Sequence, residues 1–305
     1  MSSESPTELY LAIDCGATKT SAVLCSPSGT ILARARTGRS NFAYLGLDAF
    51  LKSIGEVASS VLTTALRPPK AITLPVDLTT YVDPAGVSTP PYNLRAAWVG
   101  GAGVDSPSII SQLLPHVSAL FSIPVERLTI SNDIHLLAAP LRIFPDVQTA
   151  IAVVAGTGSI IASFRGGPVD APLEELARVG GWGWILGDEG SGFDVGRTAV
   201  RALLSQQDAG VVVAHGSLRE KILEKFGVVD VMDLLAAVYA PDSTNSLPRE
   251  SRLSSLCPLV FEAALVDSDP LAIQVVRDCA HKLARQILAV LISPSDQEVR
   301  IHLSI

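Results

Sequence analysis

The 305-residue sequence predicts an α/β protein made of two domains. At roughly 150 residues per domain the length favours two domains, and 48% apolar residues are enough to form real cores. Apolar runs of strand length alternate with longer runs at helical spacing. A strand, a turn rich in Gly and Thr, and a returning strand occur near the N-terminus and again from Thr149, which suggests two domains of one plan facing each other across a cleft.

The first domain is expected at 1–146 and holds most of the strand signals. Strands are expected at Leu9–Ile13, Ser21–Cys25, Thr30–Arg36, Ala96–Val99 and Arg127–Ser131. Helical segments are expected at Leu47–Leu66, Pro107–Phe121 and Ile134–Leu141. The stretch at 67–95 is rich in Pro, Asp and Thr, so we expect a surface insertion there.

The second domain, expected at 147–305, repeats the opening pattern and then becomes helical. Strands are expected at Thr149–Ala155, at a run ending at Phe164, and at Val299–Ile305. Beyond Gly190 the pattern is mainly helical to Ile292, with a helix start signal at Asp269-Pro270.

Charge and hydropathy exclude several classes of partner. The net charge is −7 and no basic cluster interrupts it, which argues against a nucleic acid or an anionic membrane. Mean hydropathy is +0.38, yet no run reaches the roughly 18–20 apolar residues of a membrane helix. Met1–Glu8 is polar and acidic, so no signal peptide is expected. The four cysteines lack C-x-x-C spacing, which is typical of reduced thiols and predicts a cytoplasmic protein.

A candidate phosphate site follows the first strand. Asp14 ends that strand, and the Gly16–Thr20 turn offers N–H groups, the hydroxyls of Thr18 and Thr20, and the charge of Lys19. Such a concavity suits a phosphate, and the nearby carboxylate suits its Mg²⁺. A tight hairpin in which Gly and Thr serve only geometry is an equal alternative for this short motif alone.

The second turn, Gly156–Ser159, has the same chemical character. Nothing in the chain matches the G-x-x-x-x-G-K-[ST] phosphate loop, and neither Gly stretch matches the G-x-G-x-x-G dinucleotide pattern. Two strand–turn–strand cradles in two domains instead fit a nucleotide clamped between lobes.

Asp133 is the best candidate for a general base. It follows a strand and opens a helix, where a carboxylate can take the proton of a hydroxyl nucleophile. The alternative is that Asn132 or Asp133 is only a helix N-cap, a role that both residue types favour. We expect the neighbouring His135 to be packed or exposed to solvent.

The densest group of unusual residues lies in Val179–Gly196, which contains seven glycines and two tryptophans. Glycine lets backbone approach a ligand closely. Trp182 or Trp184 could stack on a sugar face, and Asp188 could accept hydrogen bonds from hydroxyls. A glycine-rich turn with buried tryptophans is the alternative, but so many glycines are entropically costly, which favours a ligand site.

Together these segments resemble the superfamily of sugar kinases, actin and heat-shock chaperones. Its first phosphate motif, acidic motif and second phosphate motif are matched by Asp14–Thr20, by Ser131–Asp133 with Ala138-Ala139, and by Ala155–Ser159. Gly180–Gly183, running into Gly187–Ser191, is similar to the N-acetylglucosamine kinase branch, which includes the BadF/BadG/BcrA/BcrD-type ATPases.

The resemblance implies two ribonuclease-H-like lobes with ATP and a sugar in the cleft. It implies that Asp133 deprotonates the 6-hydroxyl of N-acetylglucosamine in amino-sugar salvage, and that Asp14 organises Mg²⁺ through water. The ATP phosphates would contact Gly16, Thr18, Lys19, Thr20, Gly156, Thr157 and Gly158. The sugar would contact Asn41, Ala102, Gly103, Gly180, Gly181 and Asp188. A homodimer is compatible with the resemblance.

The sequence departs from the family pattern at two places. Cys15 and Ala17 stand where relatives often have Gly, which tightens the first turn. The family has a Gly-containing adenosine-binding turn and a helix after a strand like Val299–Ile305, so we expect a C-terminal lobe that is incomplete at its adenosine-binding end.

Two other functions remain open at this point. A non-catalytic, sugar-binding regulator would fit an incomplete adenosine side. An activating ATPase of 2-hydroxyacyl-CoA dehydratases would need cysteines placed for an iron–sulfur cluster, and neither Cys257 nor Cys279 lies in such a motif.

Overall fold

The computed structural model describes residues 8–65, 71–76, 92–144, 146–167, 173–211, 216–242 and 247–291. By its contacts the chain divides into two compact units, Met1–Leu137 and Ala138–Ile305, and each is described here by itself. The sequence predicts the boundary at 146/147, slightly later in the chain. Most of the expected insertion at 67–95 and the expected strand Val299–Ile305 lie outside the described residues.

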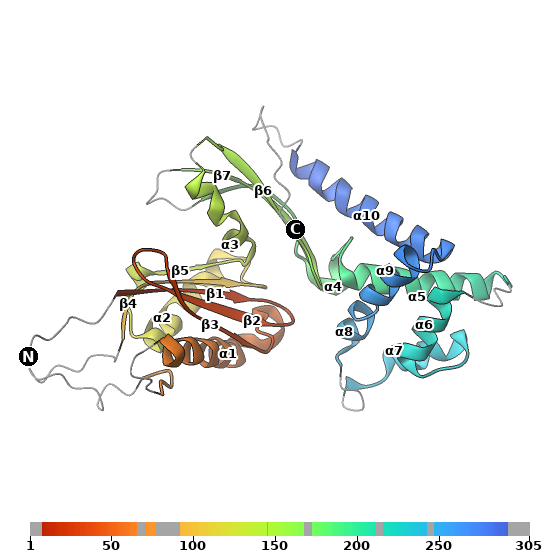
Figure 1. Ribbon diagram of the computed structural model, residues 1–305, viewed down its shortest axis with the longest axis horizontal. Coiled ribbons are helices and arrows are strands. Elements are labelled where there is room, and N and C mark those ends of the chain that lie inside the picture. The colour runs from red at the N-terminus through yellow and green to blue at the C-terminus, as the bar shows by residue number, and fades with distance from the viewer. Residues whose placement is uncertain are drawn as a thin grey trace, which may run out of the picture. The chain divides into compact units, whose positions relative to one another are not determined.

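The first unit is built on a five-stranded mixed sheet (Figure 1). Its strands are β1 (Glu8–Cys15), β2 (Thr20–Cys25), β3 (Ile31–Thr37), β4 (Asn93–Gly101) and β5 (Leu128–Ser131), in the order β3-β2-β1-β4-β5. The first three pair antiparallel, whereas β1, β4 and β5 run parallel. The carboxyl ends of β1, β4 and β5 therefore meet at one edge, where α/β folds place their ligands.

Two helices, α1 (Phe42–Ala65) and α2 (Pro107–Phe121), cover one face of this sheet (Figure 1). Side chains of β1 alternate between buried and exposed, so that Leu9, Leu11 and Ile13 face the core below the helices. The range of α1 begins before the expected Leu47 because a short turn is joined to the main helix across Gly46, which has φ 71°. The part after Gly46 agrees with the predicted helix.

A short helical passage ends the first unit and begins the second. It consists of α3 (Ile134–Ala138) and the 3-10 segment η3 (Ala139–Ile143), with a second 3-10 turn, η2 (Val125–Arg127), just before β5. The sequence predicts one helical segment at Ile134–Leu141, and the structure divides it into these two pieces. Pro140 lies near the junction and lacks an N–H for a continuous α-helix.

The second unit joins a three-stranded antiparallel sheet to a group of helices (Figure 1). The strands, in the order β6-β7-β8, are β6 (Thr149–Ala155), β7 (Ser159–Arg165) and β8 (Glu174–Gly180). The helical elements are α4 (Gly183–Leu186), α5 (Gly192–Asp208), α6 (Ser217–Phe226), η4 (Val231–Asp233), α7 (Leu234–Tyr239), α8 (Arg249–Ser254), α9 (Cys257–Leu265) and α10 (Pro270–Leu291). Helix α10 packs against all three strands and against α5 and α9.

Within the described residues, the predicted strands and helices are present, and one strand was missed. Strand β8 pairs only with β7 and has partly exposed side chains, so its sequence lacks the apolar alternation of a buried strand. The predicted helix start at Asp269 is confirmed, because Asp269 Oδ1 accepts the N–H groups of Leu271 (2.9 Å) and Ala272 (3.0 Å). None of the described helices combines the length and apolar character that a membrane crossing requires.

Candidate active site

Strand register brings two predicted acidic residues together at the carboxyl edge of the first sheet. Asp14 in β1 lies opposite Gly100 in β4, and Gly100 lies opposite Ser131 in β5. Asp133 follows β5 by two residues. Gly100 allows the close approach, because a Cβ on it would lie 3.2 Å from the Asp133 Cα and 2.5 Å from a Leu136 methyl carbon. The negative charge of Asp14 therefore acts on Asp133.

The N-cap function next to Asp133 belongs to Asn132. The Asn132 Oδ1 accepts the N–H of Ile134 at 3.0 Å, and its Nδ2 donates to Asp105 Oδ1 at 2.8 Å. The buried Asn132 is thus held at both ends of its amide. The alternative in which Asp133 serves as the cap is therefore not needed to explain how α3 begins.

The carboxyl of Asp133 has a markedly perturbed acidity. Burial raises its pKa, and the negative charges of Asp14 and Asp105 raise it further, to about 6. The N–H groups of Asp133 and Ile134 oppose this rise. A carboxylate with a pKa just below neutral is ionised at pH 7 yet basic enough to accept a proton, as a general base must be.

The first turn presents a carboxylate and a cation. Gly16 N–H donates to the Lys19 carbonyl at 2.9 Å, which closes the hairpin, and Thr18 and Lys19 are exposed at its tip. Removal from water raises the pKa of Asp14, and the charge of Lys19 opposes that rise. Thr20 differs from the prediction: its fully buried hydroxyl donates to the Gly38 carbonyl (2.7 Å) and lies 2.6 Å from Ser40 Oγ. This geometry argues against a phosphate contact by the Thr20 hydroxyl.

The residues expected to contact a sugar in the first unit lie together. Ala102 N–H donates to the Cys15 carbonyl at 2.8 Å, and the Ala102 carbonyl accepts from Phe42 N–H at 2.9 Å. Gly103 has φ 80°, and a Cβ on it would lie 2.8 Å from Asn41 Oδ1. That Oδ1 atom is buried and has no hydrogen-bond partner among the described residues. A buried acceptor without a partner is costly unless a ligand or water completes it.

In the second unit, the Gly156–Ser159 turn is joined to the start of α5. The Gly156 and Thr157 carbonyls accept the N–H groups of Gly192 (2.8 Å) and Phe193 (3.2 Å). Gly156 N–H in turn donates to the Gly158 carbonyl at 3.0 Å. The turn therefore sits at the N-terminus of a 17-residue helix, whose dipole favours negative charge.

Asp188 lies against the same turn. Its Oδ1 accepts the Ser159 N–H at 3.0 Å, and a Cβ on Gly158 would lie only 2.8 Å from that oxygen. Burial raises the pKa of Asp188, an effect that the Ser159 N–H opposes. Its φ of 65° is unusual for a residue other than glycine. Strained backbone of this kind is concentrated at functional sites.

The glycines that end β8 also adopt left-handed backbone conformations. Gly180 and Gly181 have φ values of 83° and 75°, and Gly181 N–H donates to the Ser159 carbonyl at 2.8 Å. Of the two predicted stacking candidates, Trp182 is 68% exposed, whereas the Trp184 ring packs on Phe193 with centroids 5.6 Å apart. Trp182 is thus the more exposed of the two, and the Arg178 guanidinium lies 6.0 Å from the centroid of its ring.

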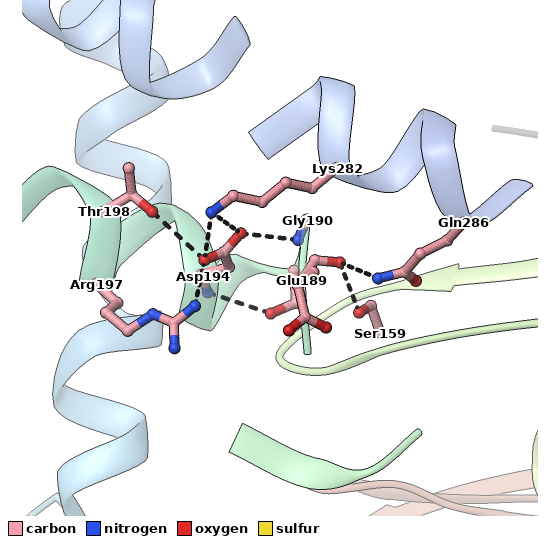
Figure 2. Close-up of polar contacts among 9 residues, drawn as sticks. Ser159, Glu189, Gly190, Asp194, Arg197, Thr198, Lys282 and Gln286 are labelled. Atoms are coloured by element: carbon pink, nitrogen blue, oxygen red, sulfur yellow. Dashed lines mark hydrogen bonds and ion pairs between the residues drawn. The ribbon is translucent and has the colours of Figure 1, made fainter. Parts of the chain in front are cut away.

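Sequence reasoning missed the polar network that holds the Asp188 loop (Figure 2). Its centre is Asp194, which binds Arg197 and, across 88 residues of sequence, Lys282. Ser191 accepts the Asp194 N–H at 3.2 Å, so Ser191-x-x-Asp194 has the form of a capping box that could have been found from the sequence. The partner Lys282 has no local signal.

No group of three or more His, Cys, Asp or Glu side chains within the described residues could hold a metal ion by itself. The cysteines are free thiols, and burial raises the pKa of Cys15 to about 12 and that of Cys279 to about 11.

Comparison with known proteins gives three results. The BadF/BadG/BcrA/BcrD ATPase family model matches residues 11–298. The chain is 28% identical to the N-acetyl-D-glucosamine kinase of Dictyostelium discoideum over 287 residues, which are 93% of this chain and 79% of that protein. It is 28% identical to the N-acetylmuramic acid/N-acetylglucosamine kinase of Clostridium acetobutylicum over 217 residues, 68% of this chain and 62% of the relative.

Among solved structures, a protein of Chromobacterium violaceum provisionally assigned as an N-acetylglucosamine kinase matches with a TM-score of 0.65. The identity is 22%, and the match covers 96% of this chain and 85% of the other. This likeness confirms the predicted α/β fold class with ribonuclease-H-like units. The match of the family model over nearly the whole chain shows that the protein belongs to the BadF/BadG/BcrA/BcrD ATPase family.

Proposed function

We propose that this protein transfers the γ-phosphoryl group of ATP to the 6-hydroxyl of N-acetylglucosamine. The names of both sequence relatives support an amino sugar as the acceptor, and the family description supports the use of ATP. The single observation that carries the proposal is Asp133, a carboxyl at a parallel strand end whose pKa is raised to about 6.

Asp133 acts as the general base. Phosphoryl transfer asks a protein mainly for positioning, for neutralisation of charge, and for one carboxylate that accepts the hydroxyl proton. The raised pKa makes Asp133 a stronger base than an ordinary carboxylate, while at pH 7 most of it is ionised. Asn132 and Asp105 hold the backbone that leads into it.

Asp14 is the residue that would hold Mg²⁺, through water. The fit rests on the closeness of two carboxyls, Asp14 and Asp133, whose charges repel each other. Lys19 is the nearby cation that acts on Asp14. When bound, Mg²⁺ supplies charge neutralisation for the phosphates. Asp14 would then position the ion, while Asp133 accepts the proton of the sugar hydroxyl.

The other proposed contacts to the ATP phosphates and to the sugar are divided between the two units. In the first unit, the Gly16–Lys19 turn binds phosphate, while Asn41 and the Ala102-Gly103 backbone bind sugar hydroxyls. In the second, the Gly156–Gly158 turn at the start of α5 binds phosphate, while Gly180, Gly181 and Asp188 bind sugar. The unpaired Asn41 Oδ1 supports the first sugar contact because it is an acceptor ready for a hydroxyl donor.

The proposal is tested by ADP release from Mg-ATP with and without N-acetylglucosamine. Sugar-dependent release, absent with the 6-deoxy sugar, is the expected result. Asp133→Asn should reduce kcat by roughly 10²–10⁴-fold with little change in sugar affinity, because a base acts in the transition state. Asp48→Asn, which alters an exposed carboxyl of α1, is the matched control and should retain wild-type turnover.

Three outcomes would overturn the proposal. Unchanged turnover in Asp133→Asn would remove that residue from the mechanism. Turnover of the 6-deoxy sugar would exclude the 6-hydroxyl as the acceptor. Binding of the sugar by the wild-type chain without any ADP release would favour a sugar-binding regulator.

A further inference from the structure

One carboxylate in the second unit is completely buried and binds two cations. The side chain of Asp194 has no exposed surface. Its Oδ1 accepts from Arg197 Nη2 at 2.7 Å, and Lys282 Nζ lies 3.0 Å from Oδ1 and 2.9 Å from Oδ2. Figure 2 shows the three side chains converging from α5 and α10.

The surroundings keep Asp194 ionised. Burial by itself would raise its pKa, but the N–H of Gly190, the Lys282 ammonium and the Arg197 guanidinium together outweigh burial and hold the pKa below its usual value. A buried carboxylate with this set of donors is a strong attachment point, because hydrogen bonds to charged groups exceed neutral ones in strength.

Asp194 fixes the loop Gly187–Ser191, which connects α4 to α5 and carries Asp188. Its Oδ2 accepts the Gly190 N–H at 2.9 Å, so the loop is tied to the first turn of α5. Because Lys282 belongs to α10, the same carboxylate also ties the loop to that helix. Gly190 itself has φ 77°, and a Cβ on it would lie 2.7 Å from the Leu283 Cβ, so the loop is pressed against α10.

The Glu189 carbonyl of the same loop binds both the β6–β7 turn, through Ser159, and α10, through Gln286. The Glu189 carbonyl accepts from Ser159 Oγ at 2.8 Å and from Gln286 Nε2 at 3.2 Å. Asp188 Oδ1 accepts the Ser159 N–H at 3.0 Å. The loop thus lies between α10 on one side and the proposed phosphate turn on the other, bonded to both (Figure 2).

This loop needs an external attachment. The positive φ of Asp188 is an unfavourable conformation for a residue with a side chain, and it persists only where neighbouring contacts enforce it. The Asp194 carboxylate, three residues after Ser191, supplies such a contact, because it is fully buried, ionic and bonded to the Gly190 N–H.

We propose that Asp194 is a positioning residue that, with Lys282, sets the geometry of Asp188 and of the Gly156–Ser159 turn. The catalytic consequence rests on the proposed kinase function. Asp194 itself touches no substrate; it acts through the Gly190 N–H and the loop. Helix α10 is thereby coupled to the phosphate turn through the Asp194–Lys282 ion pair, in addition to the hydrogen bond from Gln286 to the Glu189 carbonyl.

The first test is independent of activity and uses hydrogen exchange of the full chain. In Asp194→Asn and in Lys282→Met, the amides of Gly190 and Ser159 should exchange roughly ten- to hundredfold faster than in the wild type. Amides in the middle of β6 should be unchanged. The two variants together keep the test decisive if Asp194→Asn does not fold.

The matched control is Lys221→Met. Lys221 also belongs to a helix of the second unit and also faces two carboxylates, Glu262 at 2.6 Å and Asp267 at 3.4 Å, but these contacts lie outside the loop network. It should leave both reporter amides at the wild-type rate. Wild-type exchange in Asp194→Asn, or equal acceleration in Lys221→Met, would overturn the proposal.

The second test is kinetic. Lys282→Met should lower kcat/KM by about tenfold or more, Lys282→Arg should restore most of it, and Lys221→Met should match the wild type. Because Lys282→Arg also restores any stability that the ion pair provides, the kinetics are measured at a temperature where urea unfolding shows every variant to be folded. Lack of rescue together with wild-type amide exchange refutes positioning. If the wild type shows no sugar-dependent turnover while the amides still respond, the kinase function fails and the positioning of the loop stands.

Discussion

Replacement of the proposed base Asp133 should make the first unit more stable while it slows turnover. In the native chain Asp133 keeps its proton up to a pH of about 6, whereas a carboxyl in the unfolded chain loses it near 3.8. Between these values the native state binds more protons than the unfolded state. The free energy of unfolding therefore falls as pH rises from about 4 to about 6 and stays reduced above that range.

The size of the effect follows from the same pKa. A rise from 3.8 to about 6 corresponds to roughly 3 kcal/mol of destabilisation once Asp133 is ionised. Asp133→Asn cannot ionise, so the variant should exceed the wild type by up to about 3 kcal/mol at pH 7.5. As the pH falls from 7.5 to about 4, the difference in free energy of unfolding between Asp133→Asn and the wild type should decrease by about 3 kcal/mol.

The assay is urea unfolding followed by tryptophan fluorescence. Trp98 is the only tryptophan of the first unit, and its Nε1 donates to Ser131 Oγ at 3.0 Å, close to the site. In a background with Trp182→Phe and Trp184→Phe, the signal reports the first unit alone. A stability difference between Asp133→Asn and the parent that does not change with pH would refute the assigned pKa and its cause.

A less stable Asp133→Asn variant at pH 7.5 would have a different meaning. It would show that the ionised carboxylate makes net favourable contacts in the native state, which contradicts burial beside two other acids.

Three further predictions concern Asp105 beside the proposed base, Gly158 in the second turn, and Asp269 at the start of α10. Asp105→Asn removes one of the charges that raise the pKa of Asp133, so the acid limb of the kcat/KM profile should move to lower pH. Dividing the variant's kcat/KM by the wild-type value at each pH cancels the titration of the substrate phosphates. An acid limb that does not move would contradict the role assigned to Asp133. Gly158→Ala should lower both Tm and kcat/KM because its Cβ meets a buried carboxylate at 2.8 Å, whereas Gly167→Ala, with nothing within 4 Å, should leave both unchanged. Asp269→Ala should cost about 1–3 kcal/mol in urea unfolding because three N–H groups lose their acceptor, and a smaller loss would show that water replaces it.

The fold was largely predictable because its signals are local. A short apolar run marked β1, and apolar residues at helical spacing marked α2, whose bounds Pro107–Phe121 are those that the sequence predicts. Strand β8 was not predictable in this way, since it is half exposed and, among the residues that the structure describes, pairs only with β7. Its charged residues resemble those of a loop.

The sequence identified the candidate residues of the site, but it did not decide which of two neighbouring residues has a given role. The sequence left open whether Asn132 or Asp133 caps α3, and only the geometry assigns the cap to Asn132. Thr20 reads from the sequence as one more hydroxyl of the phosphate turn. In the fold its hydroxyl is bonded to Gly38 and Ser40, just after β3, because alternation along β2 makes Thr20 a buried position.

The Asp194–Lys282 pair shows why part of a site cannot be predicted from local sequence. The two residues are 88 positions apart and meet only because α10 packs across α5 and the sheet. A motif search finds residues that touch ligands, since close approach and charge demand particular residue types at fixed spacing. A residue that holds such a motif in place needs only complementary charge from any element that passes nearby. The glycine-rich loop is therefore recognisable in the sequence, while the ion pair that keeps its Asp188 in a left-handed conformation becomes visible only in three dimensions.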